Sequence, residues 1–274
     1  MTAIIGLPIL LARPLGGDMH ATAVVQTENI DGVSVITLNR PDVLNALNID
    51  LLSSLVEALR DQTRSARAIV VQGAGRAFCA GEDLTETLAP ETGSPDELRV
   101  AFGQLQDITR LMTAAPCPVV AAVHGYAIGG GAEIALAADF VIAGPAARMK
   151  FPESVIGHAP TGGITGRLPM MVGLLRAKDL LLTGRWVEPQ EGLAIGLYTE
   201  VSDDPKARAV ELARTLAANP PRSQSSVKSA IELAAFAAQE ANLRMEVDMA
   251  SYCFASAETA QSFEDFRTRD RNRR

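Results

Sequence analysis

With 274 residues, 47% of them hydrophobic and 21% charged, the chain can bury a substantial core, and its length predicts one main domain with a C-terminal helical region. Its formal net charge of −7 argues against nucleic acid as a general partner, because sequence-independent binding to phosphates requires clustered cations. The three cysteines form neither a CxxC pair nor a cluster with histidine. The sequence therefore predicts no disulfide framework, no structural zinc site and a reducing, cytoplasmic compartment.

The first residues of the chain show none of the patterning that follows. Ile4 to Ala12 is an apolar run, but no basic region precedes it and it is far too short to span a bilayer. A stretch typical of an ordinary enzyme N-terminus begins at Met19. We therefore interpret residues 1–20 as a leader, either disordered or an artefact of an upstream start site, and expect no membrane partner.

Alternating strands and an amphipathic helix follow the leader. Residues 24–38 predict a β-hairpin that turns at Asp31–Gly32. After the candidate N-cap Asn48, leucine and valine recur at helical spacing as far as Leu59, and residues 68–71 form a buried strand. The order strand, strand, helix, strand indicates an α/β fold.

The loop from Gly73 to Leu84 leaves this strand through several glycines. Glycine-rich turns leave main-chain N–H groups uncovered, so two such loops at neighbouring strand ends can each direct one N–H at the same carbonyl oxygen. In that arrangement Glu82 contributes its amide and not its side chain. By itself, the Ala80–Gly81 dipeptide is more typical of an ordinary structural loop.

Residues 119–139 supply the second glycine-rich turn, after a helix whose apolar stripe runs from Leu98 to Met112. The first half of the stretch predicts a buried strand and the second half a helix of small apolar residues, with Gly129, Gly130 and Gly131 at the corner. Its N–H groups lie at the positive end of a helix, and Glu133 lies in the first turn. Taken alone, the stretch fits equally well a tight turn whose carboxylate complements the helix dipole.

The sequence carries ordered motifs that are far more specific together than singly. They are Ala77–Leu84, His124–Glu133, and Phe151–Glu153 followed by Gly162–Gly163. In this combination the chain resembles the enoyl-CoA hydratase/isomerase (crotonase) family, and the resemblance runs from about Val24 to the C-terminus.

The resemblance implies a crotonase-type spiral of ββα units as the α/β core, over residues 21–204. It further implies that residues 205–274 form a helical region that covers the active site and builds homotrimers, which are often paired into hexamers. The sequence is helical in pattern over 174–183, 207–218 and 227–238, and residues 197–201 predict a strand.

The resemblance also implies an acyl-CoA substrate whose thioester carbonyl is held by the main-chain N–H groups of Glu82 and Gly130, the oxyanion hole. Glu133 and Glu153 match the two glutamates that act on water and substrate in hydratases of the family. The positions matched to coenzyme A binding are Ala80, Glu82, Asp83, Leu84, Thr85 and Gly130.

These residue types fit the hydration of a 2-enoyl-CoA to a 3-hydroxyacyl-CoA. The reaction needs a base for water, an acid for the α-carbon and donors for the enolate oxygen between them. Two carboxylates and two amides suffice, so we expect no metal and no cofactor, coenzyme A being part of the substrate. The alternatives are an enoyl-CoA double-bond isomerase, which can use one glutamate at the second position, and a non-catalytic acyl-CoA-binding or RNA-associated relative.

The segment after the second glutamate departs from the family pattern. Similar hydratases carry a glycine-rich Ile-Pro-Gly segment where this chain has Gly157–Thr161. His158 and Thr161 are therefore expected to reshape the water site or the acyl pocket. Glu82 is a second departure, because small residues are common at its position, and its side chain would need to point away from the thioester.

Overall fold

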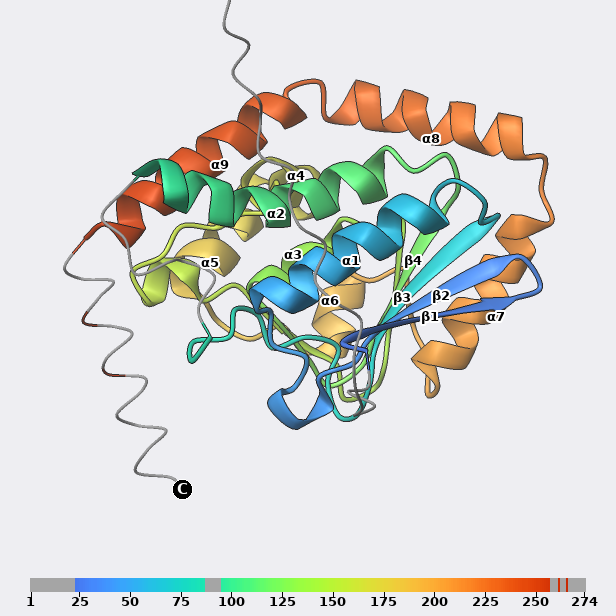
Figure 1. The fold of residues 1–274 in the computed structure, drawn as a ribbon, viewed down its shortest axis with the longest axis horizontal. Coiled ribbons are helices and arrows are strands. Elements are labelled where there is room, and N and C mark those ends of the chain that lie inside the picture. The colour runs from blue at the N-terminus through green and yellow to red at the C-terminus, as the bar shows by residue number, and fades with distance from the viewer. Residues whose placement is uncertain (1–22, 87–94, 257–260, 262–264, 266–274) are drawn as a thin grey trace, which may run out of the picture.

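The computed structural model describes residues 23–86, 95–256, 261 and 265. The predicted leader, residues 1–20, lies outside the described residues. Within them the chain forms a mixed α/β core followed by C-terminal helices (Figure 1).

A six-stranded sheet runs through the core. Its neighbouring strands, in spatial order, are β1 (Val25–Ile30), β2 (Val33–Leu38), β3 (Ala68–Gly73), β4 (Val119–Val123), β6 (Phe140–Ala143) and β8 (Glu200–Val201). The predicted hairpin is confirmed, because β1 and β2 pair antiparallel across a turn at Asp31 and Gly32, whereas the remaining pairs are parallel. The strand predicted over 197–201 shortens to its last two residues.

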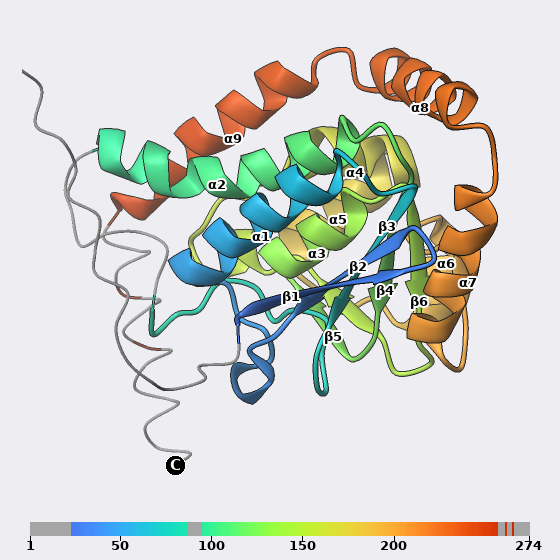
Figure 2. The same ribbon diagram turned by 45° about the vertical axis from the view of Figure 1, so that its right-hand side comes forward.

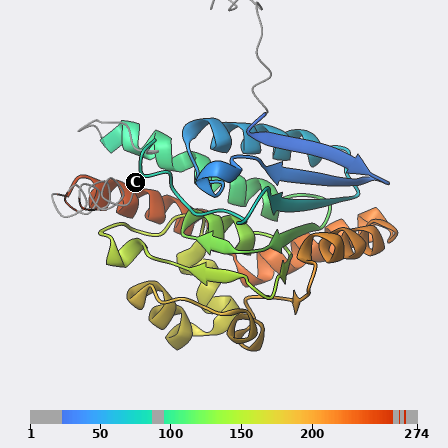
Figure 3. The same ribbon diagram turned by 90° about the horizontal axis from the view of Figure 1, so that it is seen from below.

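A second, two-stranded sheet lies on the next turn of the chain. It pairs β5 (Tyr126–Ile128) with β7 (Arg148–Lys150) in parallel. Figure 3 shows successive turns of the chain stacked on one another, from the blue N-terminal strands to the yellow helices that follow β7. The loops between strands and helices therefore approach each other from neighbouring turns.

Helices on one face of the large sheet form the main core. They are α1 (Ile49–Gln62), α2 (Pro95–Thr113) and α3 (Gly130–Leu136). Asn48 caps α1 as predicted, since its side chain accepts a hydrogen bond from the Leu51 N–H at 3.0 Å. The helical spacing of the leucines places Leu52, Leu55 and Leu59 in the core, where each buried side chain contributes about 1.5 to 3 kcal/mol.

The opposite face of the sheet is covered by α7 (Pro205–Ala217), as Figure 2 shows. Its small residues Ala209 and Ala213 pack against alternate strand residues such as Val35 and Val120, which point away from α1. The first helix of the predicted C-terminal region thus packs against the sheet.

Further helices surround this core. They are η1 (Pro41–Val43), η2 (Glu153–Val155), α4 (Ile164–Val172), α5 (Leu174–Thr183), α6 (Pro189–Ile195), α8 (Pro221–Ala235) and α9 (Gln239–Phe254). Helix α8 begins earlier than the predicted 227, because Pro221 fits the first turn, and it ends before 238, where Phe236 leaves helical geometry. Figure 1 shows α8 and α9 above α2. None of the helices in the described parts of the chain has the length and apolar character needed to cross a membrane.

Candidate active site

The corner between β5 and α3 presents main-chain N–H groups. Gly129 adopts φ +52° and ψ −124°, and its own N–H donates to the Lys150 carbonyl at 2.9 Å. The following residues, Gly130 to Ala132, form the first turn of α3, so their N–H groups have no acceptor within that helix. Gly131 packs directly on Cys79, where a Cβ would collide with the Cys79 carbonyl. Glycine is therefore required for the two loops to meet.

The second loop is oriented by a short parallel bridge between Leu47 and Glu82. The Leu47 N–H donates to the Gly81 carbonyl at 2.8 Å, and the Asp83 N–H donates to the Leu47 carbonyl at 3.0 Å. Because consecutive amides of an extended segment face opposite sides, the Glu82 N–H faces away from Leu47. Gly81, with φ +85°, lies against Ile128, whose carbonyl oxygen would be 2.6 Å from a Cβ built there.

Asp83 holds this loop in shape. One carboxylate oxygen accepts from the Thr85 N–H and hydroxyl at 3.1 and 2.7 Å and from the Glu86 N–H at 3.2 Å, while the other lies 2.9 Å from Arg40. Burial opposes the ionised form, but the hydrogen bonds from Thr85, Glu86 and Arg40 prevail and lower the pKa of Asp83. The carboxylate of this predicted coenzyme A contact therefore serves the loop itself.

One pocket of about 580 Å³ brings the predicted site residues together. Its lining includes every sequence-predicted position, namely Ala80, Glu82, Asp83, Leu84, Thr85, Gly130, Glu133 and Glu153. Apolar side chains also line this pocket, among them Phe102, Leu105 and Ile156. Thr161 and His158, which depart from the family pattern, also lie on this wall.

Within the described parts of the chain, Thr161 donates two hydrogen bonds to the Glu133 carboxylate. The Glu133 side chain, 2% exposed, receives the Thr161 N–H on Oε1 at 2.9 Å and the Thr161 hydroxyl on Oε2 at 2.7 Å. Burial raises the pKa of Glu133, and the two hydrogen bonds from Thr161 counteract that rise. Both donors favour the carboxylate form and fix its orientation.

Glu153 has a different environment. It begins η2, and its Oε1 approaches Gly129 so closely that a Cβ there would lie 2.6 Å away. Its Oε2 is buried and finds no hydrogen-bond partner among the described residues. Burial, followed by the nearby charge of Glu133, raises the pKa of Glu153 to about 8. The two hydrogen bonds from Thr161 therefore favour ionisation of Glu133, whereas the neighbouring charge of Glu133 opposes ionisation of Glu153.

The two described histidines, His124 and His158, are half-buried, and their contacts are structural. The His124 ring nitrogen Nε2 lies 3.0 Å from the Gly75 carbonyl, a structural contact. His158 packs edge-on against Phe254 with 4.8 Å between the ring centroids, and burial lowers its pKa to about 4. His158 thus presents a neutral imidazole to the pocket.

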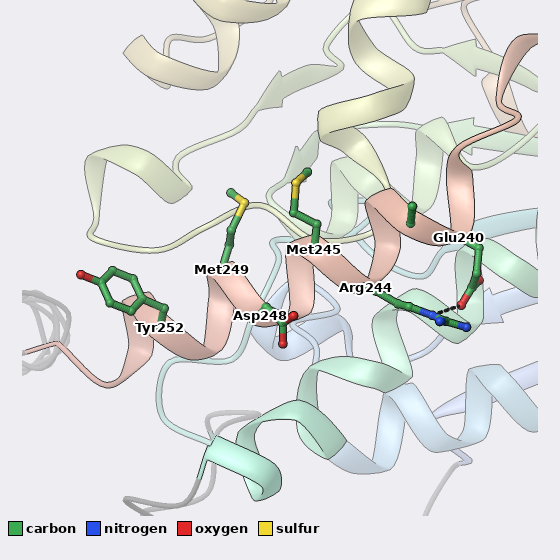
Figure 4. A pocket seen from close by; sticks show the side chains of 7 residues that line it. Glu240, Arg244, Met245, Asp248, Met249 and Tyr252 are labelled. Atoms are coloured by element: carbon green, nitrogen blue, oxygen red, sulfur yellow. Dashed lines mark hydrogen bonds and ion pairs between the residues drawn. The ribbon is translucent and has the colours of Figure 1, made fainter.

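A second hollow lies on the outer face of α9 and contains none of the predicted site residues. Figure 4 shows Met245, Met249 and Tyr252 projecting from this one helix, beside the ion pair of Glu240 with Arg244 at 3.1 Å. The side chains of Met245, Met249 and Tyr252 are 37% to 82% exposed. All of its lining comes from α9, with Glu240, Arg244 and Asp248 beside the apolar side chains, and it shares no residue with the pocket that holds Glu133 and Glu153.

Fold and pocket together define a crotonase-type α/β protein. A sequence model described as enoyl-CoA hydratase/isomerase matches residues 28–272. The chain therefore belongs to the enoyl-CoA hydratase/isomerase (crotonase) family, and the resemblance and fold class expected from the sequence are confirmed.

Relatives of known name agree with this family. A protein of Rhodobacter capsulatus named "Probable enoyl-CoA hydratase" is 39% identical over 196 residues, covering 69% of this chain and 75% of that protein. A 1,2-epoxyphenylacetyl-CoA isomerase of Escherichia coli is 33% identical over 240 residues, covering 86% and 92%. Relatives at this level of identity thus carry names of different reactions.

Solved structures share the fold over nearly their whole length. An enoyl-CoA hydratase/isomerase from Mycobacterium paratuberculosis superposes with a TM-score of 0.83 at 30% identity, covering 89% of this chain and 98% of that one. An enoyl-CoA hydratase from Bacillus halodurans gives a TM-score of 0.82 at 26% identity, covering 88% and 99%.

Proposed function

We propose that this protein hydrates a 2-enoyl-CoA to a 3-hydroxyacyl-CoA. The observation that carries the proposal is the unequal pair of buried glutamates in one pocket. Glu133 accepts two hydrogen bonds, whereas Glu153 has a buried oxygen without a hydrogen-bond partner among the described residues. Hydration requires such inequality, because one group must take a proton while another gives one.

In the proposed reaction Glu133 is the base and Glu153 the acid. Glu133 removes a proton from water as the water oxygen bonds to C3, and the π electrons move to the thioester oxygen. The N–H groups of Glu82 and Gly130 stabilise that enolate oxygen. Glu153 then protonates C2, which restores the carbonyl, and a proton passes from Glu133 to Glu153 before the next turnover.

The pocket wall supports an apolar acyl group at this position. Phe102, Leu105, Ile156 and Ala159 line it beside the two glutamates. The coenzyme A portion would run along the Ala80–Thr85 loop toward the pocket mouth. The names of the relatives, a hydratase and a 1,2-epoxyphenylacetyl-CoA isomerase, both fit an acyl-CoA substrate.

The direct test is an assay of the purified protein with short, long and aromatic 2-enoyl-CoAs, following loss of the conjugated thioester. Glu133→Gln and Glu153→Gln should each lower kcat by about a hundredfold to ten-thousandfold while acyl-CoA binding survives. Near-normal turnover in Glu133→Gln would refute its role as the base. Turnover of 3-enoyl-CoAs that depends on Glu153 alone would instead establish the isomerase.

We also propose that the protein assembles as a homotrimer or a hexamer in the cytoplasm. Exposed apolar side chains on α8 and α9 support the assembly, because such surfaces mark contacts between proteins. The buried cysteines Cys79 and Cys117 are free thiols, in keeping with a reducing compartment.

A further inference from the structure

One buried carboxylate lies outside the pocket lining. Glu246 projects from α9 with no exposed surface, and it accepts hydrogen bonds on both oxygens. The Gly163 N–H donates at 2.6 Å, and the Thr165 N–H and hydroxyl donate at 2.8 and 2.6 Å. The side-chain amide of Gln106 on α2 adds a donor at 3.3 Å. A buried carboxylate with these donors fixes the main chain that supplies them.

The main chain so fixed is continuous with Thr161, which holds Glu133. Gly162 and Gly163 adopt φ +62° and +77°, and the Thr109 hydroxyl donates to the Gly162 carbonyl at 2.8 Å. A Cβ built on Gly162 would lie 2.7 Å from the Cβ of Glu133. The segment 161–165 therefore contacts the candidate base on one side and α9 on the other.

We propose that Glu246 is a positioning residue for Glu133, fixing the segment 161–165 so that Thr161 presents both of its donors to the Glu133 carboxylate. This rests on the proposed function, in which Glu133 is the base. The docking of α9 then becomes a condition for an aligned Glu133.

The need for an anchor follows from the glycines. Gly162 and Gly163 both adopt positive φ, and glycine has wide conformational freedom. Without a further contact, the Thr161 donors would therefore occupy a range of positions relative to Glu133. Misplacing a catalytic group by about 1 Å costs on the order of a hundredfold in rate. Glu246 removes that freedom by binding both Gly163 and Thr165.

Several titratable groups lie around Glu133 and Glu153. The direction in which the pKa of Glu133 moves in a variant therefore shows whether a neighbouring charge or the Thr161 donors were lost. Burial raises the pKa of Glu153 on η2 and that of Glu246 on α9, the latter to about 7, and the Glu133 charge adds to both rises. Lys150 on β7 lowers the pKa of Glu153, and the imidazole of His158 lines the same pocket. Deleting only the Glu246 charge would lower the pKa of Glu133. Loss of the Thr161 donors would raise it.

The test compares the full-length wild type with Glu246→Gln on one enoyl-CoA. Glutamine keeps the shape, but its NH₂ group faces N–H donors that need an acceptor. We expect kcat to fall about tenfold to a hundredfold with KM nearly unchanged. The acid limb of the kcat/KM profile should move to higher pH, because Glu133 loses the donors that favour its ionised form.

Two further variants complete the experiment. Glu240→Gln removes a carboxylate from the same helix and breaks its 2.9 Å ion pair with Arg110 on α2, but does not touch the segment 161–165, so it should behave as wild type. Thr165→Val removes only the hydroxyl donor to Glu246. Thr165→Val should change kcat and the acid limb in the same direction as Glu246→Gln, but by a smaller amount. If Glu246→Gln does not fold, Thr165→Val tests the positioning role in its place.

If Glu246→Gln and Thr165→Val fold but leave kcat and the acid limb unchanged, the proposal is overturned. An acid limb that moves to lower pH in either variant would also overturn it. If the wild type turns over no enoyl-CoA, the proposed hydration fails separately. The positioning role is then judged from the ¹³C carboxyl shift of Glu133 across pH. Its titration should move upward in Glu246→Gln, and identical titrations in the two proteins would refute the role.

Discussion

Glu133 and Glu153 share one pocket but differ in their hydrogen bonds, and this difference predicts the pH dependence of turnover. The base must be ionised, so activity should be lost as pH falls through the pKa of Glu133. The acid must be protonated, so activity should be lost as pH rises through the raised pKa of Glu153, about 8. A bell-shaped kcat/KM profile measured on the free enzyme reports both limbs as properties of the coupled pair. A profile that rises steadily through the alkaline range would contradict this assignment.

Gly129 is the glycine whose replacement should be most harmful to the chemistry. A Cβ at the neighbouring Gly130 would meet the side chains of Leu47 at 2.9 Å and Leu105 at 3.4 Å. At Gly129 a Cβ would instead lie 2.6 Å from Glu153 Oε1, in a conformation that alanine adopts with strain.

Gly129→Ala should therefore lower kcat by on the order of a hundredfold, because Glu153 must move. Steady-state kinetics with a thermal melt separates this effect from unfolding. Gly103→Ala is the matched control, since a Cβ there meets nothing within 4 Å and alanine favours the helix by about 1 kcal/mol. Equal loss of activity in both variants would argue against a specific contact at Gly129.

The identities of the candidate site residues could be predicted because each sits in a local motif. Glu82, Gly130, Glu133 and Glu153 were all expected, and the structure places them on one pocket. The partners of Glu133 and the role of Glu246 were not expected in this detail. The Gly163–Glu246 bond joins positions 83 residues apart, and no local pattern encodes such a pairing.

At the scale of the element, the Ala80–Thr85 loop depends on Asp83. Asp83→Ala leaves the Arg40 guanidinium without its buried partner and should cost about 3 to 5 kcal/mol of folding free energy. The folded-state pKa of Asp83 is lowered, so its stabilisation is present above the unfolded value of about 3.9 and disappears as pH falls through the folded value. Denaturant titrations at neutral and acid pH should show the variant and wild type converging as the pH falls. A constant difference would contradict this role.

Elements with long, regular patterns were predicted well, and those defined by tertiary pairing were not. Helix α1 followed from its cap and leucine spacing, whereas β5 has only three residues and exists because it pairs with β7 and bridges to Cys79. Strand β8 is shorter than predicted for the same reason, since its ladder with β6 consists of Glu200 and Val201. Short strands carry too few residues for their period to be read from sequence.

At the scale of the whole molecule, the exposed faces of α8 and α9 bear on assembly. Val227 and Ile231 lie one turn apart on α8 and are 57% and 59% exposed. In the proposed oligomer, replacing both with glutamate would bury uncompensated charge and should reduce the assembly to a smaller species. Light scattering should give three or six times the chain mass for the wild type.

The control for this prediction is Val100→Glu on α2, which is 75% exposed and lies outside the C-terminal helices. It should leave the oligomer intact. A wild type that elutes as a monomer would refute the assembly. Unchanged mass in the α8 double variant would show that this face does not form the contact.

The link from α9 to Glu133 has a consequence for heat inactivation. Helix α9 is tied to α2 partly by exposed ion pairs such as Arg99 with Asp248, so its detachment should require less free energy than melting the sheet. Residual turnover should therefore fall at temperatures where circular dichroism still reports an intact sheet. Limited proteolysis should cut first near the end of the chain over the same interval. Such inactivation should reverse on cooling, because only α9 has to dock again.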